Sequence, residues 1–266
     1  MMIIATDQTG REIILKNLPK RIVSVVPSQT ELLFDLGLND EIVGVTKFCV
    51  HPAVFVKEKT NIGGTKKLNI EKIRSLNPDL ILANKEENSR EQIEMLAKYF
   101  PVWISDVKSL EDAFAMINTV GKITGKEQQA RKLSEKIHAQ FSELATLKFE
   151  LRTLRSAYLI WHNPMMTVGN DTFINDMMKH FGFENVFVYK KRYPEISEQE
   201  LVESNPEIIL LSSEPFPFRE KHIAHYKSIC PDTKIILVDG QMFSWYGSRL
   251  QYVPEYFLSL LRSLND

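Results

Sequence analysis

The sequence predicts an α/β protein built from two Rossmann-like lobes with parallel sheets, joined by one long α-helix. Three observations lead to this prediction. Short apolar runs rich in β-branched residues alternate with helical stretches, a helix-turn-strand unit occurs twice, and an uninterrupted helical stretch lies between the two copies. We therefore expect an N-terminal α/β lobe over residues 1–124, a connecting helix over 125–152 and a C-terminal α/β lobe over 153–266.

The first lobe opens with a predicted strand from Ile22 to Val26, which Pro27 ends. Ser28-Gln29-Thr30-Glu31 has the S-x-x-E pattern of a capping box, and it predicts a helix from Leu32 to Leu36 that stops at Gly37. Further strands are expected over residues 42–45, 80–83 and 102–104, and helices over 69–76, 89–100 and 110–120, with Asn69 and Ser89 as the caps of the first two of these helices. The stretch 47–65 is expected to be a loop with one helical turn.

The connecting helix is predicted from Lys126 to about Leu151. This stretch contains no Gly or Pro, and Leu133, Ile137, Phe141, Leu144 and Leu151 recur at helical spacing among charged residues. A helix of about 26 residues is about 39 Å long.

The second lobe repeats the alternation, with strands expected over residues 157–160, 208–211 and 235–238 and helices over 172–181, 198–203, 221–229 and 252–264. Its segment SEQELVESNPEIILLSSE, from Ser197 to Glu214, matches NIEKIRSLNPDLILANKE, from Asn69 to Glu86. An Asn-Pro-acidic turn stands at the same offset in both, which favours a true duplication over chance. Ligands of open α/β sheets bind beyond the carboxyl ends of the strands, and clefts between domains are preferred sites, so we expect a ligand cleft between the lobes.

Composition excludes several classes of function. Lys and Arg total 33 and Asp and Glu 34, a formal net charge of -1, which argues against nucleic acid as a partner. No apolar run of about 18 residues is present, so no membrane insertion is expected. The sequence lacks the dinucleotide-binding, P-loop, zinc-protease and nucleophile-elbow patterns, so we predict no catalytic residues and no enzyme. Two cysteines, Cys49 and Cys230, do not establish a disulfide.

The candidate ligand-binding residues follow predicted strands. In the first lobe, Phe48, Cys49 and His51 follow the strand that ends at residue 45. Cys49 and His51 are two apart, which would place both on one face of an extended segment. Both residue types bind borderline metals, but only two such ligands are visible here, so lining of the cleft is favoured over a metal site.

In the second lobe, two aromatic clusters have the same placement. They consist of Trp161, His162 and Asn163, and of Trp245, Tyr246 and Arg249. Their rings suit a flat ligand, and the Arg249 guanidinium suits a carboxylate or phosphate. The alternative for both clusters is core packing and helix capping.

Either Asp171 or Thr172 is expected to cap the next helix, and Trp103 is expected in the core. His222 and His225 are expected on a solvated helix face rather than at a metal.

The chain resembles the helical-backbone class of substrate-binding proteins of ABC importers. The resemblance rests on TDQTGREIILKNLPKRIVSVVPSQTELLFDLGLNDEIVGVT, NIGGTKKLNIEKIRSLNPDLILA and DGQMFSWYGSRLQYVPEYFLSLL, and it is nearest to the cobalamin-binding branch. It implies a monomer at the periplasm or cell surface that captures cobalamin, another corrinoid, haem or a ferric siderophore, with no covalently bound cofactor. The chain carries no signal peptide, so a cytoplasmic location is the alternative.

The resemblance also implies an ABC permease as partner. In this class an acidic residue on each lobe docks on the permease. The first maps onto Glu71, whereas the second maps onto Gln199, which is not acidic but is flanked by Glu198 and Glu200.

Two rival hypotheses remain at this stage. One is a zinc or manganese receptor that uses His51 and His162 with a cysteine or carboxylate. The other is a cytoplasmic protein or enzyme that handles corrinoids or chelates.

Overall fold

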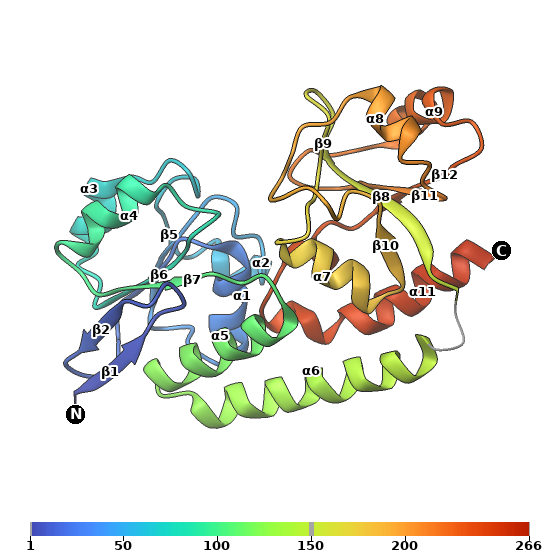
Figure 1. The fold of residues 1–266 in the computed structure, drawn as a ribbon. Helices are drawn as coiled ribbons and strands as arrows, with labels where there is room; N and C mark the ends of the chain where they lie inside the picture. Colours follow the sequence, from blue (N-terminus) through green and yellow to red (C-terminus); the bar gives the residue numbers. More distant parts are fainter. Residues whose placement is uncertain (1, 149–151, 266) are drawn as a thin grey trace. The chain divides into compact units, whose positions relative to one another are not determined.

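The computed structural model describes residues 2–148 and 152–265, which form two compact units (Figure 1). The first unit comprises the chain up to Val107, then Glu111–His138 and Tyr246–Gln251. The second comprises Lys108–Leu110, Ala139–Trp245 and the chain from Tyr252 on. Each unit contains a sheet of parallel strands with helices, so the predicted α/β class is confirmed.

The sheet of the first unit has five parallel strands in the order β5-β4-β3-β6-β7. Its central strand, β3, pairs with β4 and β6, and Ile22 and Val23 on it are fully buried. Strands buried on both faces are continuously apolar, which is why the pattern identified them. The strands are β3 (Ile22–Ser24), β4 (Ile42–Val45), β5 (Thr60–Asn61), β6 (Leu80–Asn84) and β7 (Val102–Ser105).

The helices of this half are α1 (Pro27–Asp35), α2 (Ala53–Val56), α3 (Ile70–Ser75), α4 (Arg90–Ala97) and α5 (Leu110–Ile123). Of the two predicted caps in this half, Asn69 and Ser89, only the first forms a side-chain cap bond. The Asn69 side chain accepts a hydrogen bond from the Lys72 amide and begins α3, whereas the Ser89 side chain makes no cap bond to α4.

The start of α1 corrects the predicted capping box. The helix begins at Pro27, its N-cap is Val26 in extended conformation, and no side chain caps it. Ser28 and Glu31 therefore lie inside the helix, where both are buried. Proline suits the first helical position because its φ is already helical and it has no N–H to satisfy.

A two-stranded antiparallel hairpin precedes the sheet and was not predicted. It consists of β1 (Ile3–Thr6) and β2 (Glu12–Leu15). The Asp7 carboxylate closes the turn by accepting hydrogen bonds from the backbone amides of Thr9 and Arg11, and Gly10 adopts a φ of 87°. The backbone amide of Gln8 donates to the Ile104 carbonyl and attaches this turn to β7.

The predicted long helix is confirmed as α6 (Glu127–Lys148), and its expected end near Leu151 lies outside the described residues. Figure 1 shows it as one continuous helix, and the division between the two units falls within it, after His138. Ile137, Phe141 and Leu144 form the buried stripe that the spacing predicted, whereas Leu133 is half-buried.

The sheet of the second unit has the parallel order β10-β8-β11-β12, with β9 antiparallel to β8. Its strands are β8 (Leu154–Trp161), β9 (Met166–Thr167), β10 (Phe183–Asn185), β11 (Ile208–Ser212) and β12 (Lys234–Val238). The short β9 and β10 were not predicted.

The helices that follow α6 are α7 (Phe173–His180), α8 (Glu198–Glu203), α9 (Glu220–Ile229), α10 (Gln241–Ser244) and α11 (Val253–Asn265), with a 3₁₀ turn η1 (Ser248–Gln251). Thr172, one of the two predicted caps, begins α7.

The sequence repeat is also a repeat of structure. Asn77 and Asn205 both adopt left-handed backbone conformations, with φ of 43° and 44°. The acidic residue two positions after each Asn accepts a hydrogen bond from the backbone amide of an arginine at the start of a strand segment. These pairs are Asp79 with Arg21, and Glu207 with Arg155. The same turn therefore joins helix to strand in both units, as a duplication requires.

The segment Tyr246–Gln251 returns from the second unit to the first, where a buried ion pair holds it. The Arg249 guanidinium donates from Nε to Glu31 Oε2 at 2.9 Å and from Nη2 to Glu31 Oε1 at 2.6 Å. The two side chains are 10% and 9% exposed. The Tyr246 hydroxyl donates to Glu87 Oε1 at 2.6 Å, a second attachment of this segment within the first unit.

Arg249→Met is expected to lower the free energy of unfolding by about 3–5 kcal/mol, because it leaves the Glu31 carboxylate buried without a counter-charge. The double variant Glu31→Gln with Arg249→Met is expected to recover most of that loss. Denaturant unfolding monitored by circular dichroism measures both.

Arg131→Met is the matched control, because its ion pair with Glu135 is exposed. A loss in Arg249→Met no larger than in this control would show that the Glu31–Arg249 pair is not needed for stability.

Candidate ligand-binding site

An aromatic and imidazole surface lies at the carboxyl ends of two neighbouring strands in the second unit. Trp161 is the last residue of β8, and Phe216 lies in the loop after β11. Their ring centroids are 5.7 Å apart, and the Trp161 Nε1 donates to the Asn163 carbonyl. Trp161 is still 37% exposed, so part of its indole is available to a ligand.

His162 stands beside this surface in a cluster of three histidines. Its ring centroid is 5.1 Å from that of His222 and 5.1 Å from that of His225, both on α9. Its Nδ1 lies 3.0 Å from the Tyr226 hydroxyl. The predicted solvated face of α9 is therefore wrong for His222, which is 7% exposed and accepts a hydrogen bond from the Arg219 amide through Nδ1.

The cluster favours the neutral form of the His162 imidazole. Burial lowers the pKa of His162, and the neighbouring His225 and His222 lower it further. Glu198, whose Oε1 lies 3.6 Å from His225 Nε2, has the opposite effect and raises the pKa of His162. Within residues 2–148 and 152–265, no three His, Cys, Asp or Glu side chains form a group able to hold a metal ion.

In the first unit, only part of the predicted loop is presented at the surface. Phe48 is 51% exposed, and the Lys47 ammonium lies 5.0 Å from its ring centroid. Cys49 is buried instead, with its sulfur 3.1 Å from the Thr30 hydroxyl oxygen and 3.3 Å from that of Thr46. Burial raises the pKa of the Cys49 thiol.

The expectation that Cys49 and His51 share one face fails because this segment is not extended. The Cys49 amide bonds back to the Thr46 carbonyl in a turn, which directs the thiol into the core, while His51 is half-buried. A turn changes the period-two alternation on which the expectation depended.

The third predicted cluster is engaged in packing. Trp245 is 8% exposed, and its Nε1 donates to Glu214 Oε1 at 2.9 Å. Tyr246 is 6% exposed and bonds to Glu87. Arg249, predicted to bind an anionic group of the ligand, has its guanidinium bound by Glu31 instead. The packing alternative therefore describes these three residues in this structure.

The profile of the periplasmic binding protein family matches residues 22–226, more than half of the chain. The chain belongs to the periplasmic binding protein family.

Relatives of this binding protein include transport components. It is 29% identical to an uncharacterized ABC transporter substrate-binding lipoprotein of Bacillus subtilis over 215 residues, which is 77% of this chain and 67% of the relative. It is 23% identical to the vitamin B12-binding protein of Pectobacterium carotovorum over 93% of this chain and 90% of the relative.

A solved structure shares its fold. The periplasmic vitamin B12-binding protein BtuF of Vibrio cholerae superposes with a TM-score of 0.81 at 21% identity, covering 94% of this chain and 99% of that one. This likeness confirms the predicted fold.

The positions predicted for permease docking lie on equivalent helices. Glu71 is in the first turn of α3, with its side chain 83% exposed, and the equivalent position of α8 is Gln199, whose amide donates to Glu203. Glu200 is engaged by Lys190 and by the Ser197 capping box, and Lys190 holds the pKa of Glu200 below its usual value. Glu198 remains 60% exposed.

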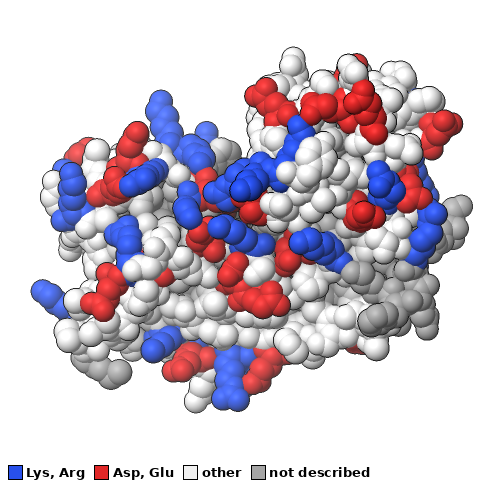
Figure 2. Space-filling view, viewed as in Figure 1, with Lys and Arg blue, Asp and Glu red and all other residues white. Residues whose placement is uncertain are grey.

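The surface of this binding protein carries both charges. Figure 2 shows basic and acidic side chains interspersed on one face. Among the described residues no helix is both long and apolar enough to cross a membrane.

The lowered pKa of His162 predicts acid sensitivity. A histidine whose folded-state pKa lies below its unfolded value binds protons preferentially after unfolding, so its stabilising contribution is present at neutral pH. That contribution is lost as the pH falls from about 6.5, the unfolded-state value, through the lower folded-state pKa. When the pH is lowered from about 7.5 to about 5, the melting temperature of His162→Asn should fall less than that of wild type. The Asn amide in this variant can still bond to Tyr226.

Gln129→Asn, an exposed position on α6 without an ionisable side chain, is the control and should retain the wild-type difference. Equal acid sensitivity of wild type and His162→Asn would show that His162 does not contribute to it.

Proposed function

We propose that this chain is the substrate-binding component of an ABC importer and that it captures a corrinoid or a ferric chelate. The observation that carries the proposal is the partly exposed Trp161, next to His162 at the carboxyl end of β8, in a member of the periplasmic binding protein family. The vitamin B12-binding relative supports a corrinoid as the first ligand to test. A location in the periplasm or at the cell surface belongs to the same proposal.

The chemistry of this surface supports a large, largely flat ligand. The exposed part of an indole offers apolar area for stacking, and imidazoles at its edge offer directional hydrogen bonds or a nitrogen for a metal centre. Haem and ferric siderophores share these features with corrinoids. On the first unit, Phe48 offers a second exposed ring.

A bare zinc or manganese ion is a less favoured ligand. The hypothesis of a metal receptor depended on His51 and His162 with a cysteine or carboxylate. Cys49 is the only cysteine near His51 in sequence, and its thiol is in the core, bonded to two threonine hydroxyls. An enzyme is also less favoured, because the relatives with which this chain compares are binding proteins.

A thermal-shift screen with cobalamin, cobinamide, haem, ferric siderophores and divalent metals identifies the ligand. A ligand that binds only the native state stabilises it by about 2.7 kcal/mol at a concentration 100-fold above Kd. A shift with one corrinoid or chelate supports the proposal. A shift with zinc or manganese alone supports the metal receptor, and no shift with any compound contradicts both.

Trp161→Ala is expected to weaken binding of that ligand by about tenfold or more, because it removes stacking area from the exposed surface. Titration calorimetry measures the change, and the same titration of Phe48→Ala tests whether the first unit contributes.

Tyr99→Ala is the matched control. Tyr99 is 59% exposed but lies just before β7, at the amino ends of the strands. If Tyr99→Ala and Trp161→Ala have equal affinities, the ligand does not contact the Trp161 surface.

We further propose that Glu71 and Glu198 are the residues that dock on a permease. They are the exposed carboxylates in the first turns of the duplicated helices α3 and α8, and Glu198 takes the role that Gln199 cannot fill. Uptake reconstituted with the permease should fall strongly in Glu71→Lys and in Glu198→Lys, while ligand affinity is retained.

Glu203→Lys, on the last turn of α8, is the control and should transport normally. Normal uptake by both docking variants would contradict this assignment without affecting the proposed ligand.

A further inference from the structure

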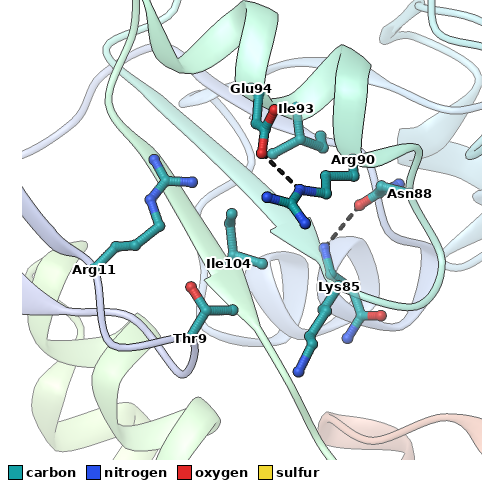
Figure 3. A pocket seen from close by; sticks show the side chains of 9 residues that line it. Thr9, Arg11, Lys85, Asn88, Arg90, Ile93, Glu94 and Ile104 are labelled. Carbon is teal, nitrogen blue, oxygen red and sulfur yellow. Dashed lines mark hydrogen bonds and ion pairs between the residues drawn. The ribbon is translucent and has the colours of Figure 1, made fainter.

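The first unit contains a pocket that the proposed ligand surface does not use. Its volume is about 270 Å³, near the lower limit for small-molecule sites and too small for a corrinoid or haem. It lies where the turn between β1 and β2 meets the ends of β6 and β7 and the start of α4 (Figure 3). Its lining residues are Thr9, Arg11, Asn84, Lys85, Asn88, Arg90, Ile93, Glu94 and Ile104.

The floor of this pocket is buried, and the side-chain amides of its two asparagines are bonded within the protein. Ile93 and Ile104 are 4% and 9% exposed. The Asn84 amide donates to Ser105 and accepts from the backbone amides of Glu86 and Glu87. The Asn88 side-chain amide donates to the carbonyls of Val25 and Thr65 and accepts from the Asn84 backbone amide. A ligand body that rests here gains apolar contact and needs no polar group.

The rim, in contrast, is charged and mostly positive. Three cations, Arg11, Lys85 and Arg90, stand against one carboxylate, Glu94. Arg90 is paired with Glu94 at 2.7 Å, and Lys85 is paired with Asp106 outside the pocket at 2.5 Å. Arg11 makes no side-chain ion pair with any carboxylate of residues 2–148 and 152–265, although its charge acts on Glu94 and the Asp7 carboxylate is bonded to its backbone amide.

Arg11 is held in position through its backbone. Its backbone amide donates to the Asp7 carboxylate at 2.9 Å, and its carbonyl accepts from the Asp7 amide at 2.8 Å. The same turn is attached to β7 through the Gln8 amide. Figure 3 shows Arg11 and Arg90 on opposite sides of Ile104, so the unpaired guanidinium stands at the edge of the apolar floor.

We propose that this pocket is a second binding site, which takes a small monocarboxylate with an apolar body. The apolar part would lie on Ile93 and Ile104, and the carboxylate would pair with Arg11, whose planar fork suits a carboxylate. One carboxylate could pair with Arg11 without displacing the Arg90–Glu94 or Lys85–Asp106 ion pair. This site is separate from the proposed importer ligand, and its test does not depend on that proposal.

The test is a titration of the ¹⁵N-labelled full chain with benzoate and with hexanoate, followed by amide resonances, with benzamide as the neutral comparison. Saturable shifts at Arg11, Arg90, Ile93 and Ile104 are expected with the two carboxylates, and much weaker binding with benzamide. Arg11→Gln should weaken benzoate binding by at least about tenfold, as expected for loss of a charge-assisted hydrogen bond. Arg11→Lys, which keeps the charge but loses the fork, should lie between the two.

Arg131→Gln is the matched control. Like Arg90, Arg131 is an exposed arginine paired with a glutamate four residues later, but it lies on α6 and does not line the pocket. It should bind benzoate as wild type does. Equal binding of benzamide and benzoate, equal affinity of Arg11→Gln and Arg131→Gln, or absence of saturation would each overturn the proposal. Arg11 is exposed and its turn is closed by backbone bonds, so its variants are expected to fold, and an unchanged amide spectrum without benzoate confirms this.

Discussion

The buried ion pair between Glu31 and Arg249 is the constraint on which the C-terminal part of the first unit depends. Taking two charges out of water is costly, and only bidentate geometry with matched partners offsets that cost. Both guanidinium contacts to Glu31 are short, which satisfies this condition. Burial raises the pKa of Glu31, against the opposing effect of Arg249, so this carboxylate tolerates burial only with its partner in place. The segment Tyr246–Gln251 is thereby committed to the first unit although the residues on either side of it belong to the second.

This ion pair also explains why Arg249, whose guanidinium suits a ligand carboxylate, binds a carboxylate of the protein in this structure. An arginine close to two aromatic residues has the chemistry to hold a carboxylate. Arg249, in the 3₁₀ turn η1, does hold one, but that carboxylate is supplied by the protein. Trp245 and Tyr246 follow the same logic, since each donates its polar hydrogen to a glutamate and buries its ring. Among the aromatic residues predicted to bind the ligand, Trp161 and Phe48 are the ones with exposed ring area.

The duplicated helix-turn-strand unit provides the common framework of both halves. In each copy a left-handed asparagine ends the helix, a proline follows, and an acidic side chain accepts a hydrogen bond from the amide of an arginine at the start of a neighbouring strand segment. These interactions fix where each strand begins, and the strand length then fixes where its carboxyl end presents the following loop. His162 in the second unit and the pocket next to Arg11 in the first both lie near such carboxyl ends.

The sequence by itself determined the features that depend on local periodicity and on short-range chemistry. These include the parallel strands, the long helix up to Lys148, the duplicated turn, the cap at Asn69 and the burial of Trp103. Only the tertiary structure determined which polar side chains are bonded within the protein and which are accessible to a ligand. Glu31 is 218 positions from Arg249, and His162 is 60 and 63 positions from His222 and His225, so no local pattern reveals these partners. The inward turn of Cys49 and the start of α1 at Pro27 were missed because a turn and a proline override the alternation and capping patterns that predicted otherwise.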